Sequence, residues 1–102
     1  MLRDLRVRPS RARGQHFLVD PRIASRALAY ADLHPSDVVL EIGPGLGVLT
    51  RGLLGRARRV IAFESGPRLA DYLRLALPEA EVLQGDALKV DWPEFDVMVS
   101  NL

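Results

Sequence analysis

The clearest indication of the fold is the segment Val38-Val39-Leu40-Glu41-Ile42-Gly43-Pro44-Gly45-Leu46-Gly47. Residues 38–42 form a short apolar run bounded by turn residues, which predicts a buried strand. The glycine-rich segment 43–47 follows at once, and glycine permits a tight turn and lets a ligand approach the backbone. The apolar residues of 48–54 then fit a helix, weakened by glycine. A strand, a glycine turn and a helix therefore follow one another here. The turn can bind a ligand, or it can be a purely structural connection between the strand and the helix.

Strands and helices alternate on both sides of this stretch. Asp20-Pro21 predicts the start of a helix that ends before His34-Pro35. Downstream, the sequence predicts strands over 59–63, 81–84 and 96–100, and a helix that Ser65-Gly66-Pro67 opens and Pro78 ends. This alternation implies a parallel sheet with right-handed crossovers, the first half of a doubly wound α/β fold.

Composition excludes several classes of protein. The 102 residues are 48% hydrophobic and 26% charged, which is too apolar for disorder and too interrupted by charge for a membrane span. The absence of cysteine excludes a disulfide framework, a thiolate metal site and a cysteine nucleophile. The N-terminus lacks the continuous apolar segment of a secretory signal, so we expect a cytoplasmic location.

The net charge of +1 hides an asymmetry along the chain. Residues 1–14 carry a net charge of +4, which leaves −3 for residues 15–102. We therefore expect a basic N-terminal arm over 1–14 that contacts RNA phosphates, because arginine binds phosphate in a bidentate manner. A frayed, solvated terminus is the alternative. The expected RNA contacts are Arg6, Arg8, Arg11 and Arg13.

Polar and glycine residues follow each predicted strand, where doubly wound sheets bind their ligands. Glu64 comes 21 positions after Gly43, and a carboxylate there can accept hydrogen bonds from both hydroxyls of a ribose; a favourable interaction with the next helix dipole is the alternative. Asp86 can accept a hydrogen bond from an exocyclic amine, or can cap a helical turn. The glycine spacing G-P-G-L-G does not match the G-x-G-x-x-G fingerprint, which disfavours a dinucleotide-dependent oxidoreductase.

Five linked motifs resemble one family of the class I, S-adenosylmethionine-dependent methyltransferases, the ribosomal RNA adenine dimethyltransferases. The resemblance spans residues 8 to 102, and the G-Q-x-F-L element is the most discriminating motif. The motifs are Gly14-Gln15-His16-Phe17-Leu18, Glu41-Ile42-Gly43-Pro44-Gly45-Leu46-Gly47, Glu64, Gln84-Gly85-Asp86-Ala87 and Ser100-Asn101-Leu102.

The resemblance implies a Rossmann-like fold, S-adenosylmethionine as cofactor, and no metal. Residues 15–102 would form the N-terminal half of the doubly wound, mostly parallel sheet, with the remaining half and a helical domain absent. Asn101 would begin the catalytic N-L-P-[YF] motif and accept a hydrogen bond from the target adenine N6. The implied cofactor contacts are His16 and Leu18 as a cover, Gly43 and Gly45 beside the methionine portion, Glu64 at the ribose, Asp86 at the adenine amine, and Asn101.

The resemblance further implies N6-dimethylation of adenosines near the 3′ end of small-subunit ribosomal RNA, within a pre-30S particle and without a membrane partner. We expect the 102-residue chain alone to be inactive, and to self-associate through an unfinished sheet. Two alternatives stay open. One is an erythromycin-resistance type methyltransferase acting on large-subunit RNA, and the other is a non-catalytic nucleic-acid-binding module similar to the mitochondrial transcription factor B proteins.

Overall fold

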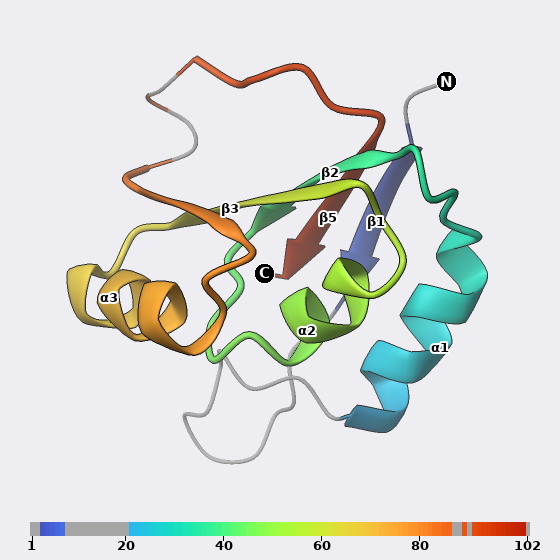
Figure 1. The fold of residues 1–102 in the computed structure, drawn as a ribbon, viewed down its shortest axis with the longest axis horizontal. Coiled ribbons are helices and arrows are strands. Elements are labelled where there is room, and N and C mark those ends of the chain that lie inside the picture. Colours follow the sequence, from blue (N-terminus) through green and yellow to red (C-terminus); the bar gives the residue numbers. More distant parts are fainter. Residues whose placement is uncertain (1–2, 8–20, 87–88, 90, 102) are drawn as a thin grey trace.

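The computed structural model describes residues 3–7, 21–86, 89 and 91–101. Five strands form one parallel sheet in the order β1-β5-β2-β3-β4, and three helices pack against it (Figure 1). The strands are β1 (Arg3–Val7), β2 (Val38–Ile42), β3 (Arg59–Glu64), β4 (Glu81–Gln84) and β5 (Val97–Asn101); the helices are α1 (Pro21–Ala31), α2 (Val48–Leu54) and α3 (Pro67–Ala76).

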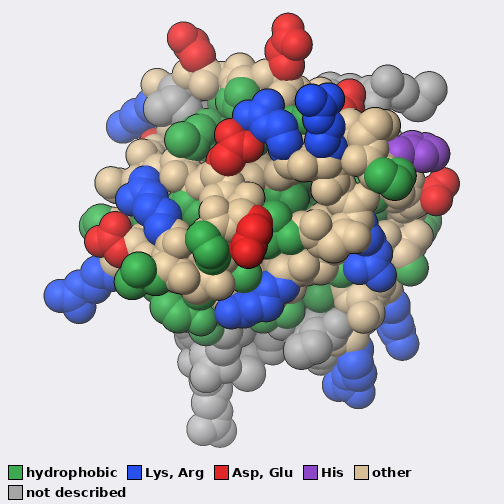
Figure 2. All heavy atoms as spheres, viewed as in Figure 1, with side chains coloured by type: hydrophobic (Ala, Val, Ile, Leu, Met, Phe, Trp, Pro, Cys, Tyr) green, Lys and Arg blue, Asp and Glu red, His purple; other side chains and the backbone are tan. Residues whose placement is uncertain are grey.

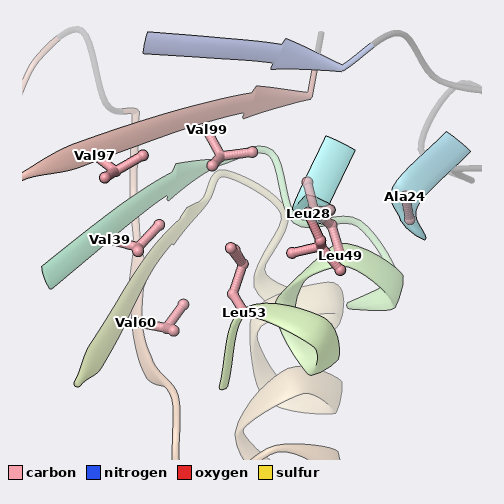
Figure 3. Packing of buried hydrophobic residues seen from close by; sticks show 8 residues of the cluster. All are labelled: Ala24, Leu28, Val39, Leu49, Leu53, Val60, Val97 and Val99. Carbon is pink, nitrogen blue, oxygen red and sulfur yellow. The ribbon is translucent and has the colours of Figure 1, made fainter. Parts of the chain in front are cut away.

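All three helices cover the same face of the sheet (Figure 1). Valines alternate along the strands toward this face, and Figure 3 shows Val39, Val60 and Val97 pointing toward the helix side chains Leu49 and Leu53. α1 adds Ala24 and Leu28 to this core, whereas Ile23 is 41% exposed, although it belongs to the apolar pattern of that helix. α3 packs separately on Val82 of β4 through its own buried leucine and alanine side chains.

The segment that joins β4 to β5 covers the opposite face of the sheet (Figure 1). Phe95 of this segment packs against Leu40, Ile61 and Phe63, which point away from the helices. The chain therefore lays β3 and β4 on one side of β2 and then crosses back to place β5 on its other side. The order of the strands reverses between β2 and β5, so the ligand site of this fold is expected at their carboxyl ends.

The strand β1 was not predicted from the sequence, which indicated only a basic arm over residues 1–14. It pairs with β5 along its whole length, from Arg3 opposite Val97 to Val7 opposite Asn101. Three of its five residues are charged, so it lacks the apolar run that predicts a buried strand. A strand at the edge of a sheet tolerates such charges, because it pairs on one side only.

Candidate active site at the carboxyl edge of the sheet

Two backbone hydrogen bonds hold the loops after β2 and β4 beside the end of β3. The Gly43 N–H donates to the Phe63 carbonyl at 3.0 Å, and the Gly85 N–H donates to the Glu64 carbonyl at 3.0 Å. They continue the pattern of the sheet beyond the last paired residues of β2 and β4. Three of the predicted site segments therefore meet at one edge, as the parallel topology requires.

The glycine loop needs its glycines for backbone conformation. Gly43 has φ +74° and Gly45 has φ +58°, which side-chain-bearing residues rarely adopt. The loop closes with a hydrogen bond from the Gly47 N–H to the Pro44 carbonyl at 2.9 Å, and α2 begins at the next residue. Gly43 is half-buried and Gly45 is buried, so the first part of the loop lies packed at the edge of the sheet.

Glu64 is the last residue of β3, and its side chain is only 6% exposed. Its Oε2 accepts a hydrogen bond from the Gly66 N–H at 2.8 Å, where Gly66 is the N-cap of α3. One oxygen therefore serves the start of the next helix, as the alternative interpretation of this residue anticipated. The carboxylate has a second oxygen, Oε1, so helix capping and ligand binding do not exclude each other.

A second carboxylate at this edge, Glu41, was not assigned a role from the sequence. Its side chain is fully buried on the helix side of β2, and Thr50 Oγ1 of α2 donates a hydrogen bond to its Oε1 at 2.5 Å. Within the described part of the chain, nothing donates to its Oε2. Burial raises the pKa of Glu41 from 4.5 to about 7; the Thr50 hydrogen bond lowers that pKa and the nearby Glu64 raises it. The signal in the sequence is a carboxylate inside an apolar strand.

Asp86 and Asn101 lie at the same edge. Asp86 follows β4 by two residues, is exposed, and accepts a hydrogen bond from the Lys89 N–H at its own carbonyl, 2.9 Å away. Asn101 ends β5, one residue beyond the pairing of Ser100 with Ile42, which brings its backbone level with the start of the glycine loop. β5 therefore runs one residue further than the predicted 96–100 and includes Asn101.

Several predicted contacts lie outside the described residues: His16, Leu18, Arg8, Arg11 and Arg13. The backbone of Arg6 lies in β1, opposite Ser100. Two surface hollows among the described residues, of about 420 and 550 Å³, lie at the opposite end of the sheet, beside Ala57 before β3 and beside Val38 and Asp96 before β2 and β5. Among the described residues, no three His, Asp or Glu side chains form a potential metal site, and no helix is long and apolar enough to cross a membrane.

Comparison with known proteins identifies the family. A family model described as ribosomal RNA adenine dimethylase matches residues 8–101. The chain belongs to this family. A probable ribosomal RNA small subunit methyltransferase A from Thermococcus kodakarensis is 50% identical over 98 residues, which cover 94% of this chain and 35% of that protein. The protein of the same name from Methanothermobacter thermautotrophicus is 48% identical over 104 residues, which cover 100% and 38% of the two chains.

Solved structures of two methyltransferases confirm the predicted fold. A dimethyladenosine transferase from Plasmodium falciparum superposes with a TM-score of 0.77 at 35% identity, over 81% of this chain and 32% of that one. The 23S rRNA methyltransferase ErmE superposes with a TM-score of 0.72 at 42% identity, over 79% and 35%. The chain has the Rossmann-like class I methyltransferase fold and spans about a third of the length of the curated relatives that it matches.

Proposed function

We propose that this chain is the S-adenosylmethionine-binding part of an enzyme that dimethylates N6 of adenosines near the 3′ end of small-subunit ribosomal RNA. The family match over residues 8–101 carries the proposal, because it includes the glycine loop and Glu64. The names of the sequence relatives support small-subunit RNA as the substrate.

The residues at the carboxyl edge fit such a cofactor. Gly43 and Gly45 place no side chain between the loop and the methionine portion, and the second oxygen of Glu64 can accept a hydrogen bond from a ribose hydroxyl. The unpartnered Oε2 of Glu41 adds a buried acceptor behind the loop. Asp86 would accept from the adenine amine, and His16 and Leu18 would cover the cofactor. When bound, S-adenosylmethionine supplies the methyl group.

Asn101 is the residue that we assign to the target base. An asparagine amide oxygen accepts hydrogen bonds and carries no charge, so it can bind an exocyclic N6–H without protonating the amine. The lone pair of this amine is delocalised into the ring, and an acceptor that holds the amine at a fixed angle favours its reactive geometry. The target base must leave its stack to reach this edge.

The proposal extends to the RNA contacts, the substrate particle, the cellular location and self-association. The arm residues Arg6, Arg8, Arg11 and Arg13 would contact RNA, and the substrate would be a pre-30S particle in the cytoplasm. Self-association would use the two edges of the sheet, which are β1 and β4. ErmE, named a 23S rRNA methyltransferase, keeps large-subunit RNA as the second candidate substrate, because its sequence identity to this chain is 42%.

A chimera tests the proposed activity. Residues 8–101 would replace the matching segment of the Methanothermobacter thermautotrophicus relative, and mass spectrometry would measure dimethyladenosine in both ribosomal RNAs. We expect dimethylation of small-subunit RNA by the chimera, and a loss of about 100-fold on Asn101→Ala, the scale of losing one positioned hydrogen-bonding group.

The matched control is Glu94→Gln, an exposed residue in the segment before β5. We expect the control chimera to keep its full rate. Modification of large-subunit RNA alone would support the ErmE-type alternative. A folded chimera that binds both RNA and cofactor but methylates neither RNA would support the non-catalytic module.

A further inference from the structure

Positive charge is concentrated on the part of the surface that α1 and α2 form. Between residues 21 and 58, the exposed charged side chains are Arg22, Arg26, Arg51, Arg56 and Arg58 against the single acid Asp32, while Asp37 and Glu41 are buried. Between residues 59 and 96, four exposed basic side chains stand among six exposed acids: Arg59, Arg68, Arg74 and Lys89 with Asp71, Glu79, Glu81, Asp86, Asp91 and Glu94. The α1 and α2 side is therefore positive, whereas α3 exposes Arg68 and Arg74 beside Asp71, and the other acids lie outside that helix.

Four arginines make up what we call the α1–α2 basic surface: Arg22, Arg26, Arg51 and Arg56. The first two lie one turn apart on α1, which packs directly against α2. Figure 2 shows Lys and Arg side chains, without Asp or Glu, projecting at the lower right, where Figure 1 places α1. This arrangement concentrates positive charge on two neighbouring helices.

The α1–α2 basic surface begins at the same edge of the sheet as the candidate active site. Arg51 Nη1 donates to the carbonyl of Leu46 in the glycine loop at 3.4 Å, and Arg22 lies in the first turn of α1. Arg56 lies further along and donates to the Gly52 carbonyl at 3.4 Å. These are long bonds to backbone, and a guanidinium has five N–H donors, so donors remain for an anion.

We propose that the RNA backbone on one side of the target adenosine lies along the α1–α2 basic surface, with its phosphates bound by these arginines. The inference rests on the proposed function, because it places the RNA of that same site. Arginine is suited to phosphate, which it binds through two parallel hydrogen bonds. Positive charge concentrated on two neighbouring helices would attract the RNA backbone along α1 and α2.

Two double variants of the 102-residue chain test this placement. Arg22→Gln/Arg26→Gln removes two charges from α1, and the matched control Arg68→Gln/Arg74→Gln removes two exposed charges from α3. Binding of an RNA oligonucleotide from the 3′ end of small-subunit ribosomal RNA would be measured over a range of salt concentrations. We expect the α1 variant to bind at least about tenfold more weakly, with a salt slope shallower by about 1.4, as for two lost phosphate contacts on a single strand. The α3 variant should change by less than about threefold.

The outcomes separate this inference from the proposed function. Each variant would also be titrated with S-adenosylmethionine, and unchanged cofactor affinity in the α1 variant would show an intact fold and site. Equal weakening by both variants, no weakening by either, or no RNA binding by a chain that binds the cofactor would overturn the placement. Tighter binding to phosphatidylserine vesicles than to RNA would also overturn it. Failure of the wild type to bind the cofactor would instead count against the proposed function.

Discussion

Replacing Glu41 by glutamine should raise the free energy of unfolding at pH 8 by about 3 kcal/mol, and change it little below pH 4.5. Burial holds the pKa of Glu41 at about 7 in the folded chain, against 4.5 for an exposed glutamate. Ionising this carboxyl in the folded state therefore costs about 1.4 kcal/mol for each pKa unit of that difference. Glutamine has no charge to bury, and its amide oxygen can still accept the Thr50 hydrogen bond.

The sign of the pH dependence follows from the raised pKa. Between pH 4.5 and about 7 the folded chain holds a proton that the unfolded chain has released, so the contribution of Glu41 to stability falls as the pH rises through this window and is constant above it. Urea unfolding from pH 4 to pH 8 would measure the effect, with the exposed Glu79→Gln as control. Parallel stability curves for the wild type and Glu41→Gln would contradict the burial of an ionisable carboxyl at this position.

Replacing Glu64 by alanine should weaken S-adenosylmethionine binding by about 10-fold to 100-fold. A hydrogen bond to a charged group contributes about 1.5 to 3 kcal/mol, and a tenfold change in affinity corresponds to about 1.4 kcal/mol. Calorimetric titration of the chain would measure the loss. The control is Glu81→Ala, because Glu81 is an exposed glutamate at the start of β4, paired with Arg59 at the far end of the sheet.

The Glu64→Ala variant must be shown to fold, because it also removes the acceptor of the Gly66 N–H. A thermal melt of both variants serves this purpose. Cofactor affinity that is the same in folded Glu64→Ala and in the wild type would remove Glu64 from the site. Equal weakening in Glu64→Ala and Glu81→Ala would indicate a general effect on the sheet.

Much of the fold is predictable because its signals are local. The run 38–42, the glycines after it and Pro67 at the start of α3 each act within a few residues, and the structure places those elements where the sequence predicts them. β1 is not predictable from local signals, because its strand conformation depends on pairing with β5, about ninety residues away in the sequence. No local pattern in Arg3–Val7 encodes that pairing.

The candidate site divides in the same way. The position of Gly43 and Glu64 at the same edge is predictable from the sequence, because the carboxyl ends of parallel strands meet at one edge of the sheet. The raised pKa of Glu41 is not predictable from the sequence, because it depends on complete burial and on the hydrogen bond from Thr50. Only the packing of α2 against β2 brings Thr50 into contact with Glu41. Ile23 belongs to the apolar pattern of α1, and the pattern alone does not predict its exposure in the structure.

A nitrogen-15 chemical-shift titration of the chain with S-adenosylmethionine would show whether the cofactor binds at the carboxyl edge of the sheet. We expect saturable shifts concentrated in the amides of residues 43, 45–47, 64–66 and 85–86, with little change at 92 and 94–96 beside the hollow at the opposite end of the sheet. The absence of saturable shifts, or shifts concentrated at 92 and 94–96, would contradict cofactor binding at the carboxyl edge.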